Sequence, residues 1–270
     1  MSRRSAALAR ALPAVALLLL AGFAMVRTCS VEAAVPTADE WLHAAAFVRS
    51  QKSAAELVVI APDWLDPVGR AHLGELITLA DATRADAARY AGIWEVARGN
   101  ARHRDTTSLT PSLTRRFGAL TVRRYPQVPV GVITDFATQL AVARVEGNVA
   151  RGPAFDYAEV GFAPHRCVIV TPVAGGQVKL HFAAMALGSS LVGYVGLADV
   201  FTRRDVRNPG AFTVLVDGEV KTQLQVGVDD GWLRWTAPTT AGPHEVTVVV
   251  AAVGKGARDR NVCWNMEARQ

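Results

Sequence analysis

The chain has 270 residues, half of them apolar and a fifth charged, which is enough for two modest hydrophobic cores. Its net charge is +5, but the first 34 residues hold four arginines and one glutamate and so carry +3 of it. The remaining +2 is too small for a surface that tracks nucleic-acid phosphates, so we expect no nucleic-acid partner.

The first 34 residues form a targeting segment. Three arginines precede an uncharged apolar run, Ala11–Val26, and small residues follow at Ala33 and Ala34. Because the run is shorter than the ~20 residues of a transmembrane helix, it predicts either a cleaved signal peptide or an N-terminal anchor in the inner membrane. Both alternatives predict an exported protein, periplasmic or membrane-anchored, with its bulk facing outward.

Residues 37–126 have the pattern of a small α/β domain. Thr37 and Glu40 have the spacing of a capping box, which predicts a helix over residues 38–53. Leu57–Ala61 is a short apolar run closed by Pro62, typical of a strand buried on both faces. Ile93–Ala97 and Ala119–Tyr125 predict two more strands. Together they predict a Rossmann-like domain, and we expect the proline-rich stretch around residue 127 to be a linker.

Residues 128–270 are rich in predicted strands. Turn signals of glycine, asparagine and proline separate them, which favours a jelly-roll-like β-sandwich. Besides one hairpin, the predicted strands are Ile133–Val145, Cys167–Thr171, Val178–Ala184, Ser190–Phe201, Leu233–Thr236, Glu245–Val253 and Val262–Glu267.

The hairpin is Ala211–Val226, which reverses at Asp217-Gly218. A two-residue turn would place Val216 opposite Glu219 and mix apolar and charged side chains on one face. One extra turn residue, with the glycine in a bulge, would instead pair Val216 with Val220 and Phe212 with Leu224. We predict the second register.

Cys167 and Cys263 are the only cysteines after the leader. They lie near the two ends of the predicted sandwich, whose first and last strands are expected to be neighbours. In an oxidising compartment such a pair predicts a disulfide, with two buried thiols as the alternative.

Two resemblances rest on short patterns. The stretch from Thr37 to Tyr125 contains LVVIAP, a proline-rich loop, YAGIWEV and a strand ending in RRY. It resembles the soluble extracytoplasmic α/β segment of some GT-C-type membrane glycosyltransferases. In that family catalysis depends on acidic loops of the multispanning part, so the resemblance does not imply transferase activity for this chain alone.

The C-terminal region, Cys167–Arg269, is similar in pattern to jelly rolls of the carbohydrate-binding-module type. The similarity rests on a VDG hairpin at residues 216–218, a DGW segment at residues 230–232 and a closing strand. It implies a glycan as ligand.

Candidate catalytic residues follow the first buried strand. Asp63, Asp66 and His72 stand where open α/β sheets bind ligands, and two carboxylates with a histidine suit acid–base chemistry. The alternative is that the carboxylates shape a stiff loop between Pro62 and Pro67 and that His72 is a surface residue. No glycine-rich phosphate cradle or metal-ligand spacing is present, so we expect no cofactor and no metal.

Candidate ligand-binding residues lie around Trp232-Leu233-Arg234-Trp235. On a strand Leu233 and Trp235 share one face, which we predict to be the core, while Trp232 and Arg234 share the other. Trp232 would then lie at the rim beside Asp229 and Asp230, where an indole can stack on a sugar. The alternative is that a neighbouring loop covers the ring and that the aspartates only form a turn.

The sequence therefore leaves three hypotheses. The first is a non-catalytic cell-envelope protein with a carbohydrate-binding-like sandwich, accessory to glycan assembly. The second is a periplasmic hydrolase or transferase that uses Asp63, Asp66 and His72. The third is a structural partner domain that binds an envelope protein within a membrane complex.

Overall fold

A computed structural model describes residues 17–25, 35–198, 209–254 and 260–270. The predicted leader lies mostly outside this part of the chain, and its described portion, residues 17–25, is helical. None of the helices in the described ranges combines the length and the apolar character needed to cross a membrane.

The chain divides into two units. The first, here the α/β unit, comprises Met1–Ile77 and Gly92–Gln127, and the second, the sandwich unit, comprises Thr78–Ala91 and Val128–Gln270. Residues 78–91, which we expected in the N-terminal domain, therefore belong with the sandwich.

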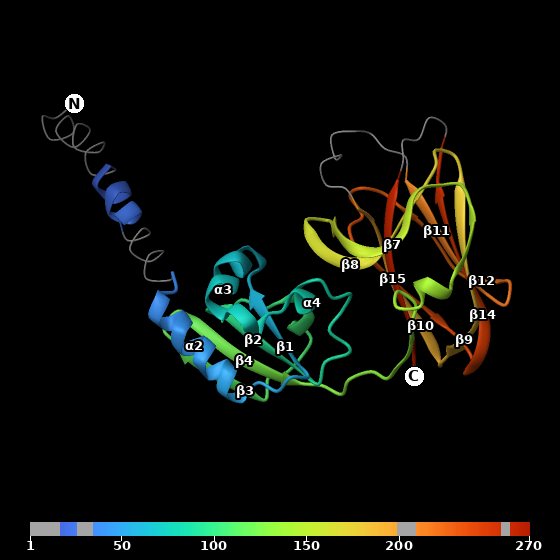
Figure 1. Ribbon diagram of the computed structural model, residues 1–270. Helices are drawn as coiled ribbons and strands as arrows, with labels where there is room; N and C mark the ends of the chain where they lie inside the picture. The colour runs from blue at the N-terminus through green and yellow to red at the C-terminus, as the bar shows by residue number, and fades with distance from the viewer. Residues whose placement is uncertain (1–16, 26–34, 199–208, 255–259) are drawn as a thin grey trace, which may run out of the picture. The chain divides into compact units, whose positions relative to one another are not determined.

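The α/β unit is one mixed sheet with helices on one face (Figure 1). The strands are β1 (Glu56–Ala61), β2 (Gly92–Arg98), β3 (Leu113–Phe117) and β4 (Leu120–Pro126), in the order β1-β2-β4-β3. The helical elements are α2 (Ala38–Gln51), η1 (Asp63–Leu65), α3 (Asp66–Leu73), η2 (Gly74–Leu76) and η3 (Arg104–Thr106). Only β1 and β2 are parallel, and β4 runs antiparallel to both neighbours. The α/β character is present, but a Rossmann-like parallel sheet is not seen in the described residues, because a tight turn at Gly118 joins β3 to β4.

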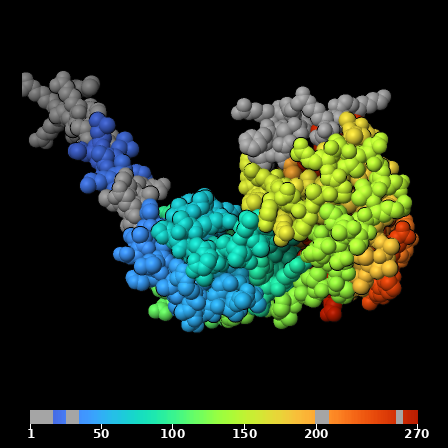
Figure 2. Space-filling model, in the orientation of Figure 1, coloured from blue at the N-terminus to red at the C-terminus, as the bar shows by residue number. Residues whose placement is uncertain are grey.

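The predicted start of α2 is confirmed. The Thr37 hydroxyl accepts from the amide of Glu40 at 3.3 Å, and the Glu40 carboxylate accepts from the amide of Thr37 at 3.1 Å. α2 buries Trp41, Ala44 and Val48 against the sheet. Figure 2 shows α2, in blue, beside the turquoise α3 on the surface of this unit.

The opposite face of this sheet carries a buried carboxylate. Glu95 has no exposed surface and accepts from Arg123 Nη1 at 2.8 Å and from the Tyr125 hydroxyl at 3.0 Å. Burial alone would raise the pKa of Glu95, but hydrogen bonds from Thr106, the amide of His103 and Arg123 outweigh it, so the pKa lies below its usual range. The helix-facing side of the sheet is not purely apolar either, because Glu56, buried beside Trp94, pairs with Arg124.

The sandwich unit contains two facing sheets, as predicted (Figure 1). One has the order β13-β10-β15-β8-β7, with β5 also pairing with β15, and the other has the order β12-β11-β14-β9-β6. The elements are α4 (Leu79–Ala82), β5 (Val132–Asp135), η4 (Leu140–Val142), β6 (Arg144–Gly147), β7 (Val149–Val160), β8 (Ala163–Pro172), β9 (Gln177–Leu187), β10 (Ser190–Ala198), β11 (Gly210–Val216), β12 (Glu219–Val226), β13 (Leu233–Pro238), β14 (Gly242–Ala252) and β15 (Asn261–Arg269). From β8 onward the chain crosses repeatedly between the sheets, and aromatic and branched side chains such as Phe182, Phe212 and Trp264 fill the space between them.

The predicted strand Ile133–Val145 is interrupted. Asp135 accepts from the amide of Ala137 at 3.1 Å, and its carbonyl accepts from the amide of Thr138 at 3.1 Å. These local bonds replace the strand ladder and close a turn, so β5 ends at Asp135 and β6 starts at Arg144.

The predicted hairpin register is correct at its open end and wrong at its turn. Phe212 pairs with Leu224 as expected, but Val216 pairs with Glu219. Asp217 (φ 50°) and Gly218 (φ 81°) both adopt positive φ, which gives a two-residue turn. The extra residue lies within β12 instead of in the turn, next to the pair formed by Val214 and Thr222. Val220 is half-exposed. A bulge within β12 therefore restores the register that we had assigned to the turn.

Residues 78–91 are held on the sandwich by a partly buried ionic network. Asp86 accepts from Arg269 Nη2 at 2.8 Å and from the Tyr194 hydroxyl at 2.9 Å. Arg89 donates to Glu267 at 2.8 Å and to Asp135 at 2.6 Å. The segment thereby joins β10, β15 and β5, although it lies between two elements of the α/β unit in the sequence.

Candidate functional site

The three candidate acid–base residues lie on the connection that follows β1. Asp63 opens η1, while Asp66 and His72 lie on α3, which begins where we predicted a stiff loop. Pro67 stands in the first turn of α3, where its missing amide costs no helical hydrogen bond, so it starts a helix instead of preventing one.

Asp66 and His72 each have a partner of their own. Asp66 accepts from Arg70 Nε at 2.5 Å, and the exposed ring of His72 stacks on Trp41 with centroids 5.5 Å apart. Six positions along an α-helix turn the side chain by about 240°, so Asp66 and His72 point in different directions. The cavity at the end of β1, described below, is lined by none of the three.

Trp235 of β13 and Trp232, which directly precedes this strand, lie on opposite faces as predicted. Trp235 is 6% exposed and packs in the core against Phe212. Trp232 lies on the outer face, partly exposed, and stacks on His165 at 4.4 Å and on Tyr194 at 5.8 Å between ring centroids. Its indole therefore already has two aromatic partners within the protein.

The residues predicted to accompany Trp232 serve the turn before β13. Asp230 accepts from the amide of Gly227 at 2.6 Å, and Gly231 adopts a positive φ of 68° directly after it. Asp229 and Arg234 are exposed. In the described ranges no group of three histidine, cysteine, aspartate or glutamate side chains could hold a metal ion.

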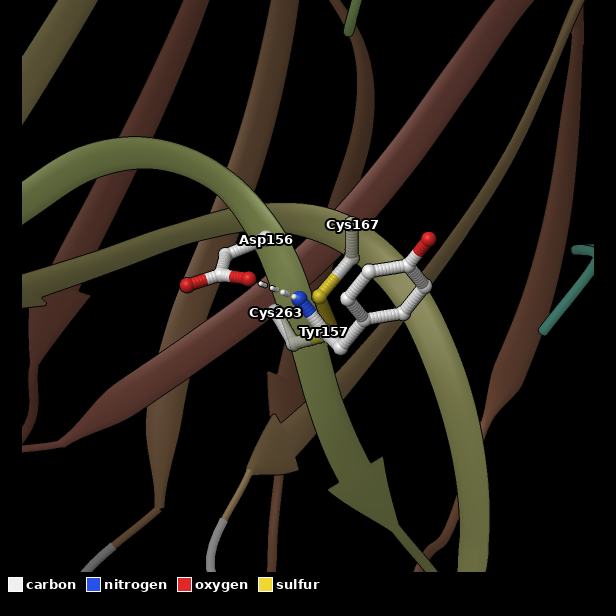
Figure 3. The surroundings of a disulfide bond; sticks show 4 residues. All are labelled: Asp156, Tyr157, Cys167 and Cys263. Carbon is white, nitrogen blue, oxygen red and sulfur yellow. Dashed lines mark hydrogen bonds between the residues drawn. A yellow bond between two sulfur atoms is a disulfide. The ribbon is translucent and has the colours of Figure 1, made fainter. Parts of the chain in front are cut away.

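The predicted disulfide is present and lies on the outer face of the β7-containing sheet. Cys167 of β8 and Cys263 of β15 have Cα atoms 5.6 Å apart, and the two strands are antiparallel neighbours. Both cysteines are fully buried and pack against Val160, Ala198 and the edge of Trp232. Figure 3 shows the bond beneath β7, beside Asp156 and Tyr157. The disulfide thus fixes a small apolar layer outside the main core.

A groove of about 350 Å³ opens over this layer. We call it the β7–β8 groove, and its lining residues are Arg151, Gly152, Ala154, Asp156, Tyr157, Ala158, Glu159, Ile169, Ala198 and Asn261. The floor is made of alanine and isoleucine side chains, and the rim carries one arginine, two carboxylates and one amide. Tyr157 also lines the groove; its ring is 45% exposed and has the Arg166 guanidinium 5.7 Å from its centre.

Polar groups at the groove are held in place by their own hydrogen bonds. One oxygen of Asp156 accepts from the amide of Tyr157 at 2.8 Å, which leaves the other oxygen for a ligand (Figure 3). The Asn261 carbonyl oxygen accepts from the Thr171 hydroxyl at 2.7 Å, which orients its NH₂ group. Close approach of β7 to β8 requires Gly152, because an added Cβ would lie 2.4 Å from the Ile169 carbonyl oxygen.

Sequence reasoning missed this groove because it missed β7. Gly152 and Pro153 interrupt the strand, and the apolar alternation is limited to Phe155 and Tyr157, because Val160 is three residues further on. A usable signal was present: Gly147-Asn148 marks a turn, and aromatic residues two apart behind it favour a strand.

No protein-family model matches the sequence, and comparison with curated proteins finds no similar chain. The solved structures to which the chain is similar include carbohydrate-binding modules. One contains the second family 51 module of Clostridium perfringens ZmpB in complex with GlcNAc (14% identity, 58% of this chain, 36% of that chain, TM-score 0.37). Another is the tandem family 51 modules of a Streptococcus pneumoniae family 98 glycoside hydrolase (12% identity, 56% of each chain, TM-score 0.37).

A third is a family 35 module from Clostridium thermocellum (11% identity, 52% of this chain, 99% of that chain, TM-score 0.29). The chain spans about a third to a half of the length of the first two structures. The resemblance of the N-terminal half to glycosyltransferases is not among these similarities. Because the TM-scores are below 0.5, these similarities do not locate a ligand site, which only the side chains of this chain can do.

Proposed function

We propose that the protein is a non-catalytic, exported glycan-binding protein and that the β7–β8 groove holds the sugar. The observation that supports this most directly is that Tyr157, 45% exposed and with the Arg166 guanidinium 5.7 Å from its ring centre, lines a groove that also has apolar side chains and oriented polar groups. Sugar rings present apolar C–H faces and a rim of hydroxyls, which match an aromatic ring and planar hydrogen-bonding side chains respectively.

The charge of the groove favours a neutral sugar. Asp156 and Glu159 against Arg151 leave one net negative charge, and carboxylates accept hydrogen bonds from hydroxyl groups. An anionic sugar would meet like charge here.

We favour binding over catalysis because two of the three acid–base candidates are engaged by other side chains. Asp66 is paired with Arg70, and His72 is stacked on Trp41. The rival hydrolase or transferase would need Asp63, Asp66 and His72 to converge on one substrate.

We assign Trp232 a supporting role. Its contact with the disulfide layer stiffens the sheet under the groove, while its two stacking partners occupy the ring. Asp229, Asp230 and Arg234 remain at the rim of that sheet, outside the groove lining.

The disulfide also bears on the cellular location. A disulfide between neighbouring strands is typical of an oxidising compartment, which agrees with export to the periplasm. We place the protein in the cell envelope, either released or held at the inner membrane through the N-terminal segment, as an accessory to glycan assembly.

A glycan array with residues 35–270, followed by calorimetric titration of the best glycan, tests the proposal. We expect Tyr157→Ala to weaken binding by about tenfold or more, equivalent to ~1.4 kcal/mol. Leu42→Ala, which removes an exposed apolar side chain of α2 that lines neither the groove nor any other described cavity, is the control and should bind as the wild type does.

Three results would contradict the proposal. An equal loss of glycan affinity in Tyr157→Ala and in the control variant would place the sugar outside the groove. Absence of any glycan ligand would favour the structural partner domain. Cleavage or transfer of an array glycan, with loss of that activity in Asp66→Asn, would favour the enzyme.

A further inference from the structure

A second concave surface lies in the α/β unit, at the end of the sheet where β1 and β2 finish. We call it the β1–β2 cavity; its volume is about 630 Å³, and the residues that matter here are Pro62, Trp64, Arg98, Arg116, Gly118 and Thr121. The carboxyl ends of adjacent parallel strands commonly bind ligands, because the chain diverges there to form loops. The β3–β4 turn at Gly118 closes the other side.

Trp64 is the wall of this cavity. It is 64% exposed, whereas its neighbour Leu65 is buried in the core and anchors η1. The guanidinium carbon of Arg98 lies 5.6 Å from the centre of the Trp64 ring. A large exposed indole on an anchored turn offers a stacking surface beside the Arg98 guanidinium.

The charge of the cavity is positive. Arg98 and Arg116 line it with one acidic residue, Glu40, whose carboxylate is already engaged by the amide of Thr37 in the helix cap. Thr121 also lines the cavity, is 3% exposed, and its hydroxyl has no hydrogen-bond partner among the described residues. Two guanidinium groups beside an indole suit a ligand that has both an apolar face and a negative charge.

The residues of the connection after β1 argue against a nucleotide as the ligand. A nucleoside diphosphate needs a cradle of backbone amides, but the connection after β1 opens with Pro62, which has no amide hydrogen, and contains no glycine before α3. Arginine side chains instead bind single carboxylate or phosphate groups.

We propose that the β1–β2 cavity binds an anionic saccharide: the sugar ring stacks on Trp64, and its carboxylate or phosphate pairs with Arg98 and Arg116. This site is separate from the β7–β8 groove, and the inference does not depend on glycan binding there.

The test is an NMR titration of ¹⁵N-labelled protein, residues 35–270, that follows the indole N–H signal of Trp64, assigned by its loss in Trp64→Phe. The probes are glucuronate, glucose 6-phosphate, glucose and inorganic phosphate. We expect the two anionic sugars, or one of them, to shift the signal with saturation, and glucose and inorganic phosphate to bind at least about tenfold more weakly. A response to glucuronate alone would assign a carboxylate ligand, and a response to glucose 6-phosphate alone a phosphate ligand.

Arg116→Gln should reduce the affinity for the anionic sugar, and higher salt should weaken binding to the wild type. Tyr157→Ala should leave the affinity unchanged. Arg116 is exposed on an edge strand, so its replacement leaves the core intact, and the indole spectrum reports folding directly. The inference is overturned if neither acid moves the Trp64 signal, if glucose binds equally well, if inorganic phosphate alone binds as tightly, or if Arg116→Gln binds as the wild type does.

Discussion

The β7–β8 groove and the β1–β2 cavity are built in opposite ways. The groove lies on the face of a sheet, its backbone is held by ladder hydrogen bonds and a disulfide, and its rim carries net negative charge. The cavity lies at the end of a sheet, its walls come from connections, and its rim is positive. Both offer an exposed aromatic ring. The difference teaches that rigidity is supplied by strands in one site and by a single buried anchor, Leu65, in the other.

Removing a core tryptophan should produce the largest difference in stability between the two units. We expect Trp235→Ala to destabilise the sandwich unit by about 3–5 kcal/mol, because a large buried ring leaves a cavity. The indole signal of Trp64 should be unaffected. Denaturant unfolding followed by the indole signals of Trp264 and Trp64 separates the two units, since one transition cannot describe both. If Trp235→Ala lowers the free energy of unfolding by less than Trp232→Ala does, the assignment of Trp235 to the core is wrong.

Opening the disulfide should affect the sandwich unit and its groove but not the β1–β2 cavity. Cys167 and Cys263 are 96 residues apart in sequence, so the bond closes a long loop, and its loss should cost about 2–5 kcal/mol in unfolding free energy. We expect the double variant to alanine to lose glycan affinity while the Trp64 titration is unchanged. Mass spectrometry of protein taken from the periplasm should find no free thiol at either position, and two free thiols would contradict the pairing.

Acid should weaken both units through different carboxylates. The pKa of Glu95 in the α/β unit is lowered, and so is that of Asp86 in the sandwich unit, where burial is outweighed by Arg269 and the amide of Ala88. A carboxyl group with a lowered folded-state pKa stabilises the fold above its unfolded value, near 4.5 for Glu95 and 3.8 for Asp86, and that stability is lost as pH falls toward the folded value.

Glu95→Gln should therefore flatten the pH dependence of unfolding below about pH 5 in the α/β unit only, and Asp86→Asn in the sandwich unit only. Unfolding midpoints measured between pH 3 and pH 7 for each unit test this, and a change in the wrong unit would refute the assignment.

Trp232→Ala should have the smallest effect on stability. Its ring is partly exposed and stacks on His165 and Tyr194, contacts that contribute about 0.5–1.5 kcal/mol each. If Trp232 only supports the sheet, glycan affinity should fall by less than it does in Tyr157→Ala. A larger loss of affinity in Trp232→Ala would mean that the sugar binds at Trp232, as the sequence predicted.

Local signals predicted much of this structure. The capping box at Thr37, the buried strands β1 and β2 and the Cys167–Cys263 pair all depend on nearby residues or on strand neighbours. The hairpin register was half right, because Phe212 opposite Leu224 follows from alternation, whereas the place of the bulge depends on backbone angles at Asp217.

Features that depend on distant contacts were not predicted. β7 has a broken pattern and is a strand because β8 pairs with it. Residues 78–91 leave the α/β unit because Arg269, nearly two hundred residues away, binds Asp86 at 2.8 Å. The groove and its exposed Tyr157 depend on both the strand and the disulfide, so a sequence pattern alone could not locate them.

The docking of residues 78–91 has a consequence for proteolysis. A protease that cuts the linker near Val128 should not release the sandwich, because the N-terminal fragment still holds it through Asp86–Arg269 and Arg89–Glu267. The two fragments should co-elute at neutral pH and separate in high salt with Asp86→Asn. A recombinant sandwich that begins at Val128 would also leave Arg269 and Glu267 without these partners. The smallest fragment expected to fold with its native surface is therefore a non-covalent pair, in which a peptide of residues 78–91 complements the C-terminal piece.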